Sequence, residues 1–193
     1  MIDEEFFKKG YKVVKGFLPK DFCKFALSYF KIRQDALQYT IDPQCPRSKS
    51  FYADPFCETL LVSSGRKISD LIGVELIPTY SYARIYARNE KLKKHKDRPE
   101  CQFSATLCLA YPEEEGISSI FMAKQEDESD RSELFLEVGD LCIYMGNEIY
   151  HWRPPFKHCW YLQTFLHYVD SNGIYKDRLY DGRFALGVKL KNA

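Results

Sequence analysis

Lys94-His95-Lys96-Asp97 and the later segment Gly139-Asp140-Leu141-Cys142-Ile143-Tyr144-Met145, which leads to His151, set the framework of this sequence. His95 and Asp97 are two positions apart, so at the end of an extended strand both side chains point the same way. The later segment is a turn followed by an apolar strand, which delivers His151 to a defined place. Two imidazoles and one carboxylate suit iron(II) and leave positions on the ion open. We therefore predict a metal centre, and with it the catalytic residues, at His95, Asp97 and His151.

Each of these residues taken singly has a simpler interpretation. His95 and Asp97 would form a surface ion pair in a lysine-rich turn, and His151 would be a hydrogen-bonded histidine at the end of a strand. Their order and context together favour the metal. His158 and His167 are not needed for it: we expect His158 in a loop, and the sequence leaves open which way His167 faces on the last long strand.

The composition indicates a folded protein. The chain has 193 residues, of which 45% are hydrophobic and 16% aromatic, enough for one domain with a substantial core. The net charge of +1 gives no argument for nucleic acid or an anionic membrane surface, and no basic stripe with interleaved aromatics suggests nucleic-acid binding. No apolar run approaches the length of a membrane span, and MIDEEFFKKG does not resemble a signal peptide. We expect a cytoplasmic protein without a membrane partner.

Cysteine usage agrees with that compartment. The chain has seven cysteines, an odd number, and no pair has the C-x-x-C spacing. Several lie inside apolar, strand-like runs, so we expect mostly buried and reduced thiols. The alternative to free thiols is a structural zinc site. The cysteines are Cys23, Cys45, Cys57, Cys101, Cys108, Cys142 and Cys159.

The first part of the chain predicts a strand and two helices. Residues 11–17 favour a strand, and apolar residues at helical spacing predict a helix of about 16 residues from Leu18-Pro19-Lys20-Asp21, with Asp21 as N-cap. Residues 41–50 are expected to be a loop whose Arg47 and Lys49 could touch substrate. The second helix runs from Asp54-Pro55 to a C-cap at Gly73, with Gly65 as a candidate break point.

From residue 74 the pattern changes to strands. Alternating residues of one strand share a face: Tyr80, Tyr82, Arg84 and Tyr86. Two helices before seven or eight short strands predict an antiparallel double sheet with helices packed on one face. We divide a single domain, residues 1–193, into helical support (about 19–73), barrel (about 74–170) and a tail (171–193) that wraps the domain or ends in a short strand.

Several motifs resemble the iron(II)/2-oxoglutarate-dependent oxygenases, especially the prolyl 4-hydroxylase-like branch. They are the strand 82–86, His95-x-Asp97, Gly139-Asp140-Leu141, and His151 followed by Pro154-Pro155. The resemblance covers residues 74–170, half of the chain. It implies a mainly β double-stranded β-helix, a jelly-roll, cupin-like barrel with N-terminal helices. Related halogenases have a small residue where this chain has Asp97, so the resemblance implies a hydroxylase or another oxidase.

The resemblance also implies the cofactors and the reaction. The expected cofactors are Fe(II), 2-oxoglutarate as co-substrate, and O2. Hydroxylation of a protein side chain such as proline, or of a small molecule, would release succinate and CO2. The alternatives are a non-catalytic sensor of metal or 2-oxoglutarate and a cupin-like metalloprotein that uses no 2-oxoglutarate. The sequence identifies neither the substrate nor the oligomeric state, and purified protein could carry another divalent metal.

The family holds the distal carboxylate of 2-oxoglutarate with a cation about ten residues after the second histidine, and arginine suits this role because it offers a bidentate fork. Residues 159–163 of this chain contain no basic residue. The best substitute is Arg153, which would point inward like His151. Arg84 is the runner-up, beside Tyr86, which matches a tyrosine of that pocket in the family. Lys157 is a third option in a loop.

Other polar residues are candidates for substrate binding. Arg98 follows the triad aspartate, so we expect it at the mouth of the site. Its role there would be to bind substrate or to orient Asp97; the simpler interpretation is a surface arginine. Tyr82 shares the face of the pocket tyrosine. Gln163 and Thr106 are polar residues in apolar strands and are expected to face the cavity. Loops 41–50, 88–94 and 125–132 are expected to select the substrate.

Overall fold

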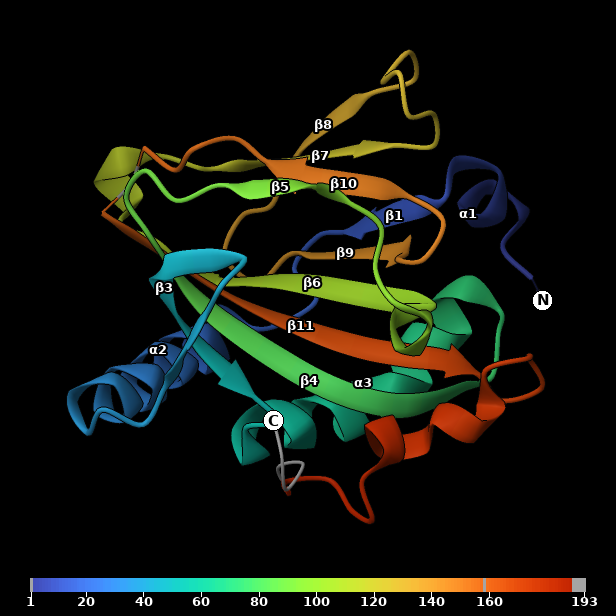
Figure 1. Ribbon diagram of the computed structural model, residues 1–193, viewed down its shortest axis with the longest axis horizontal. Helices are drawn as coiled ribbons and strands as arrows, with labels where there is room; N and C mark the ends of the chain where they lie inside the picture. The colour runs from blue at the N-terminus through green and yellow to red at the C-terminus, as the bar shows by residue number, and fades with distance from the viewer. Residues whose placement is uncertain (1, 158, 189–193) are drawn as a thin grey trace.

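Two facing β-sheets form the body of the protein, and its helices lie mainly against the outer face of the larger sheet (Figure 1). The computed structural model describes residues 2–157 and 159–188. Within them, neighbouring strands pair antiparallel throughout both sheets. The predicted mainly β architecture, with helices on one face, is confirmed. None of the helices in the described ranges is long and apolar enough to cross a membrane.

The larger sheet has seven strands in the order β1-β9-β6-β11-β4-β3-β2. Its strands are Tyr11–Val14 (β1), Leu141–Met145 (β9), Phe103–Ala110 (β6), Trp160–Asp170 (β11), Leu76–Ala87 (β4), Cys45–Tyr52 (β3) and Thr40–Asp42 (β2). Apolar residues from one face of β6, β9 and β11 form a core with α3. Alternate residues point to the opposite face, toward the smaller sheet, so this sheet has an apolar and a mixed side.

The smaller sheet has four strands in the order β5-β10-β7-β8. They are Leu92–His95 (β5), Tyr150–Arg153 (β10), Ser119–Ala123 (β7) and Ser132–Phe135 (β8). Leu92, Ile120 and Met122 of this sheet share a hydrophobic cluster with Tyr86 and Tyr144 of the larger one. This cluster joins the two sheets, and several of its residues also line the cavity described below.

Three α-helices and three 3-10 turns complete the described part of the chain. They are Glu4–Lys9 (α1), Lys20–Asp35 (α2), Pro55–Ile72 (α3), Pro99–Cys101 (η1), Glu113–Glu115 (η2) and Lys176–Gly182 (η3). Capping explains their ends: Asp54 accepts the Phe56 amide at the start of α3, and Gly73 ends it in the left-handed conformation, as predicted. Helix α1 was not predicted, although Asp3 caps its start and Gly10 its end.

The predicted loop 41–50 is wrong, because most of it forms strands β2 and β3. Proline is tolerated because Pro46 lies outside the β3–β4 ladder, which begins only at Lys49. The intervening turn is set by the Asp42 carboxylate, which accepts the Gln44 amide at 2.8 Å. This hairpin therefore extends the larger sheet beside β4 instead of forming a mobile connection.

Three smaller expectations also change. The first strand ends at Val14, before Gly16 turns the chain at φ 59°. Helix α2 is capped at Pro19, so Asp21 lies in its first turn and is not the N-cap. Helix α3 is unbroken at Gly65, where an added Cβ would make only an ordinary van der Waals contact with the Tyr168 ring at 3.5 Å.

The described part of the C-terminal tail wraps the larger sheet, and the predicted alternative, a short strand, does not occur within it; residues 189–193 lie outside the described range. The tail is fastened by Arg183, which forms a buried ion pair with Glu58 of α3 at 2.6 Å. The same guanidinium donates to the Thr79 carbonyl oxygen at 3.1 Å. A charge pair this deep has a large cost when one partner is removed, because the other is left buried and unpaired.

Replacing Arg183 by Met is therefore expected to lower the free energy of unfolding by about 3–5 kcal/mol. Urea unfolding followed by circular dichroism measures the change. Arg66→Met is the matched control, since the Arg66–Asp70 pair is exposed and is worth about 0.3–0.5 kcal/mol. A similar small loss for both variants would show that the ion pair does not hold the tail.

Candidate metal centre

The two histidines face each other across adjacent strands. His95 at the end of β5 is the direct antiparallel partner of His151 in β10, and their ring centroids lie 4.3 Å apart. Directly opposed residues of antiparallel strands have closely spaced Cβ atoms on one face of the sheet. Asp97, two residues after His95, is anchored where its amide donates to the Gly146 carbonyl oxygen at 2.8 Å. The backbone therefore brings together the three predicted ligands.

Hydrogen bonds set the tautomers of both imidazoles. Nδ1 of His95 lies 2.8 Å from the Lys93 carbonyl oxygen, and Nδ1 of His151 lies 3.1 Å from that of Ile149. A carbonyl oxygen only accepts, so both Nδ1 atoms carry hydrogen; each Nε2 atom offers a lone pair when its ring is neutral and donates a hydrogen bond to Asp97 when the ring is protonated. Each Nε2 lies 3.4 Å from Asp97 Oδ1. Two nitrogens and one oxygen thus converge on a single point, with the ligand set of an iron(II) triad.

The electrostatics of the cluster favour a charged carboxylate. Burial by itself would raise the pKa of Asp97, but the neighbouring His151 and His95 outweigh burial and hold that pKa well below its usual range. Burial would lower the pKa of His95, while its hydrogen bond with Asp97 gives a net rise. The aspartate therefore stays ionised and available as a metal ligand at neutral pH.

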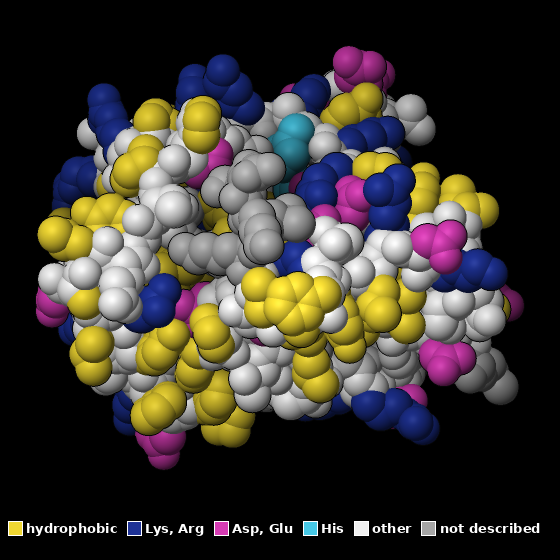
Figure 2. Space-filling model, turned by 60° about the horizontal axis from the view of Figure 1, so that its bottom comes forward, with side chains coloured by type: hydrophobic (Ala, Val, Ile, Leu, Met, Phe, Trp, Pro, Cys, Tyr) yellow, Lys and Arg dark blue, Asp and Glu magenta, His cyan; other side chains and the backbone are white. Residues whose placement is uncertain are grey.

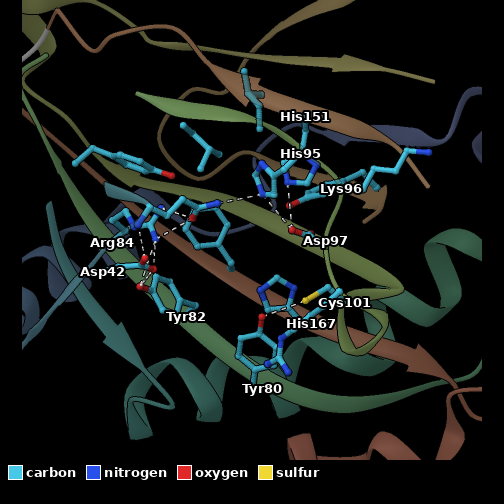
Figure 3. A pocket seen from close by; sticks show the side chains of 17 residues that line it. Asp42, Tyr80, Tyr82, Arg84, His95, Lys96, Asp97, Cys101, His151 and His167 are labelled. Atoms are coloured by element: carbon cyan, nitrogen blue, oxygen red, sulfur yellow. Dashed lines mark hydrogen bonds and ion pairs between the residues drawn. The ribbon is translucent and has the colours of Figure 1, made fainter. Parts of the chain in front are cut away.

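The three ligands lie in the wall of a cavity of about 270 Å³ (Figure 3). The inner face of β4 supplies its opposite wall, as the alternation predicted, through Tyr80, Tyr82, Arg84 and Tyr86. On the face in Figure 2, a histidine side chain reaches the surface among basic and acidic groups. The centre is therefore accessible from solvent: His95 and Asp97 are half-buried, and His151 is buried.

Arg153 reaches into the interior of the barrel from β10, only 2% exposed. Its guanidinium lies 6.0 Å from the Tyr86 ring centroid and 5.6 Å from that of Tyr161, both on the inner face of the larger sheet. One Nη1–H donates to the Ser119 carbonyl oxygen at 3.0 Å. Its Nε and Nη2 atoms have no hydrogen-bond partner among the described residues. A buried cation in this condition is costly unless an anion joins it.

More buried polar atoms on this face lack hydrogen-bond partners in the described part of the chain: the Tyr86 hydroxyl, the Thr106 hydroxyl and both amide atoms of Gln163. Register places them together, because Gln163 pairs with Arg84, and Thr106 pairs with the cavity-lining Phe165. Cross-strand partners point to the same face. This register turns Thr106 and Gln163 toward the inner face, but neither of them lines the cavity of the metal centre, and both are fully buried. Substrate contact by Gln163 stays a prediction.

Arg84 is already engaged. Its guanidinium pairs with Asp42 at 2.7 Å and donates to the Gln44 side-chain oxygen at 3.3 Å, both on the β2–β3 hairpin. The Tyr82 hydroxyl donates to the same Asp42 carboxylate at 2.7 Å. The role predicted for Arg84 in co-substrate binding stays a prediction, and its contacts tie the hairpin to β4. Tyr82 remains a candidate substrate contact at the cavity wall.

Arg98 lies at the mouth of the cavity and makes a bidentate pair with Asp181 of η3, with both N–O distances at 2.8 Å. Its guanidinium also covers the Tyr80 ring at 4.5 Å. The pair with Asp181 connects the C-terminal segment to the mouth of the cavity. Substrate binding by Arg98 stays a prediction. Lys157 is exposed, and His158 lies outside the described residues.

Sequence reasoning missed two features of the site. Gln44 places its side-chain nitrogen 3.4 Å from His95 Nε2, although nothing in its local sequence marks it. Ser104 contacts Asp97, and the buried His167 contacts Ser104. The only sign of this arrangement in the sequence is a serine inside the apolar run 102–111. Six of the seven cysteines are buried, as predicted, and all seven are free thiols.

Comparisons with known proteins support the fold. No protein-family model matches the sequence, and no curated protein matches it. A prolyl-4-hydroxylase from Pseudomonas putida has a similar structure, with a TM-score of 0.67 at 16% identity, covering 86% of this chain and 96% of that chain. HygX from Streptomyces hygroscopicus, solved with nickel, 2-oxoglutarate and hygromycin B, gives 0.64 at 14% identity over 89% and 88% of the two chains.

A third similar structure is the non-heme α-ketoglutarate-dependent carbocyclase SnoK from nogalamycin biosynthesis, with a TM-score of 0.69 at 11% identity over 100% of this chain and 94% of that chain. Identities this low show the fold alone. They confirm the predicted double-stranded β-helix and its likeness to prolyl-4-hydroxylase and other iron/2-oxoglutarate oxygenases. Among the described residues, the predicted ligands lie together in this fold.

The metal-free protein should lose stability in mild acid because of His167. Burial lowers the pKa of this ring from 6.5 to about 4. As the pH falls, the His167 ring of the unfolded chain takes up a proton near pH 6.5, whereas the ring of the folded chain takes it up only near pH 4. The free energy of unfolding therefore decreases as the pH falls from about 6.5 toward about 4. Between pH 7 and pH 5 the loss due to His167 is about 2 kcal/mol.

Urea unfolding of the natural protein and of His167→Asn, both with metal removed by a chelator, measures this contribution. The natural protein should show the steeper loss between the two pH values. Equal slopes would mean that the ring titrates normally in the folded state.

Proposed function

We propose that this protein is an iron(II)- and 2-oxoglutarate-dependent dioxygenase that hydroxylates a C–H bond of a protein side chain or a small molecule. The observation that carries the proposal is the pairing of two sites in one barrel. One is the convergence of His95 Nε2, His151 Nε2 and Asp97 Oδ1 at the cavity wall. The other is the buried Arg153 with unpartnered N–H groups. A metal and an anionic co-substrate meet these two needs together.

The residues fit both groups. His95, Asp97 and His151 would hold iron(II), since their lone pairs converge and their other polar atoms are hydrogen-bonded. Arg153 would hold the distal carboxylate of 2-oxoglutarate, assisted by the Tyr86 hydroxyl. A carboxylate there would supply the missing acceptors to the guanidinium and remove the cost of an isolated buried charge.

When bound, iron(II) and 2-oxoglutarate supply the oxidising chemistry, in which O2 and the 2-oxo acid yield succinate, CO2 and a hydroxylated substrate. The chain contributes placement. The three ligands leave part of the metal's surroundings to the cavity. The buried Tyr144 and the partly buried Phe165 line the cavity and keep water from the reacting groups. Tyr82 and Arg98 at the wall and rim are the candidates for contact with substrate.

The direct test is an anaerobic titration of the apoprotein with iron(II) and then 2-oxoglutarate, followed by the visible charge-transfer band of the chelate. Arg153→Met should bind iron normally but lose 2-oxoglutarate affinity about 30-fold or more, the effect of removing one partner from a buried charge pair worth at least 2 kcal/mol.

Arg84→Met is the matched comparison, because the Arg84 guanidinium is already neutralised by Asp42. Its 2-oxoglutarate affinity should change much less. Affinity lost in Arg84→Met and kept in Arg153→Met would exchange the two assignments. Iron binding without a band at any 2-oxoglutarate concentration would contradict the dioxygenase proposal and leave a cupin-like metal protein.

Turnover separates an enzyme from a sensor. The loaded protein in air should convert 2-oxoglutarate slowly to succinate even without substrate, and mass spectrometry detects the product. His151→Ala, which removes one ligand, should form none. A chelate band with no succinate above the His151→Ala background would favour a non-catalytic sensor of metal or 2-oxoglutarate.

A further inference from the structure

The two oxygens of Asp97 have different surroundings. Oδ1 faces the Nε2 atoms of His95 and His151, each at 3.4 Å. Oδ2 points away from them and accepts a hydrogen bond from the Ser104 hydroxyl at 3.1 Å. In the carboxylate, only Oδ1 is therefore directed at the point where the three ligand atoms converge.

Ser104 is itself held by a second buried side chain. Its hydroxyl oxygen lies 2.9 Å from Nδ1 of His167 and 3.2 Å from the Cys101 carbonyl oxygen. Serine has one proton to donate, and the ionised Asp97 is its strongest acceptor. His167 then donates its Nδ1 hydrogen to the Ser104 oxygen. The result is a chain, His167 Nδ1–H to Ser104 Oγ–H to Asp97 Oδ2, in which each donor has one acceptor.

The backbone leaves room for this chain at Gly146. A Cβ added there would lie 2.7 Å from both Asp97 Oδ2 and the Ser104 hydroxyl oxygen, and 2.3 Å from the Cys101 carbonyl oxygen. Glycine is required by this close approach. In Figure 3, His167 and Cys101 lie on the far side of Asp97 from the paired histidines. Ser104 and His167 are 1% and 5% exposed, so bulk water does not compete for their hydrogen bonds.

We propose that Ser104 and His167 are positioning residues that hold Asp97 as a one-oxygen ligand, an inference that rests on the proposed function. A carboxylate free to rotate can bind a metal through both oxygens. Its second oxygen would then take a position needed by the co-substrate. By holding Oδ2 away from the metal, the chain keeps that position open and orients Oδ1.

The test compares Ser104→Ala with the natural protein in anaerobic titrations with iron(II) and then 2-oxoglutarate. Losing a hydrogen-bond partner of a metal ligand costs about 10- to 100-fold in metal affinity. We expect a loss in that range, together with a weakened or shifted chelate band, because the freed Oδ2 competes with 2-oxoglutarate. Ser81→Ala is the matched control: Ser81 is a fully buried serine whose hydroxyl has no partner among the described residues.

A second pair of variants covers the case in which Ser104→Ala does not fold. His167→Asn keeps an N–H donor near the position of Nδ1, whereas His167→Phe keeps a ring without a donor. The proposal expects the band and iron affinity to be retained in His167→Asn and reduced in His167→Phe. A purely packing role would favour the ring, and so the reverse order.

The possible results separate the two proposals. A folded Ser104→Ala protein with natural iron affinity and an unchanged band would overturn the positioning role while leaving the dioxygenase intact. Equal behaviour of the two His167 variants would overturn it as well. Absence of the band in the natural protein would instead remove the proposed function, and the positioning role with it, without any variant being needed.

Discussion

The ionised Asp97 between two imidazoles is the interaction on which the rest of this structure depends. A carboxylate this deeply placed is costly unless its charge is answered locally, and here His95, His151 and Ser104 answer it. Strand pairing, tautomers fixed by backbone carbonyls and the close approach at Gly146 all serve this arrangement. The fold contributes a rigid frame in which three ligand atoms meet before any metal arrives.

The inner face of the larger sheet combines apolar residues with buried polar groups. Its outer face packs with apolar residues against α3, while the inner face carries the hydroxyl of Thr106, the amide of Gln163 and a neighbouring guanidinium, Arg153, all incompletely hydrogen-bonded. Buried polar groups in stable proteins are rarely left in this condition. Their presence on the face opposite the smaller sheet agrees with the anionic ligand proposed for the interior.

The sequence was informative where a short pattern decides a local structure. Strand alternation, the Asp54 and Gly73 caps and the spacing of His95 and Asp97 each follow from local geometry. The β2–β3 hairpin was missed because its two prolines favour a loop, and only the neighbouring strand β4 makes it a strand. Contacts such as Ser104 with His167 join residues 63 positions apart in the chain, and one sequence alone contains no local pattern that records them.

The direct pairing of His95 with His151 has a consequence for folding. Strand β5 has four residues, lies at the edge of its sheet, and its pairing with β10 is interrupted between His151 and Arg153. A slip of one residue would turn a strand's side chains to the opposite face. An ion bound to both histidines is compatible only with the native register. Metal binding at the proposed site would therefore favour the correct alignment of this weakly specified edge strand by mass action.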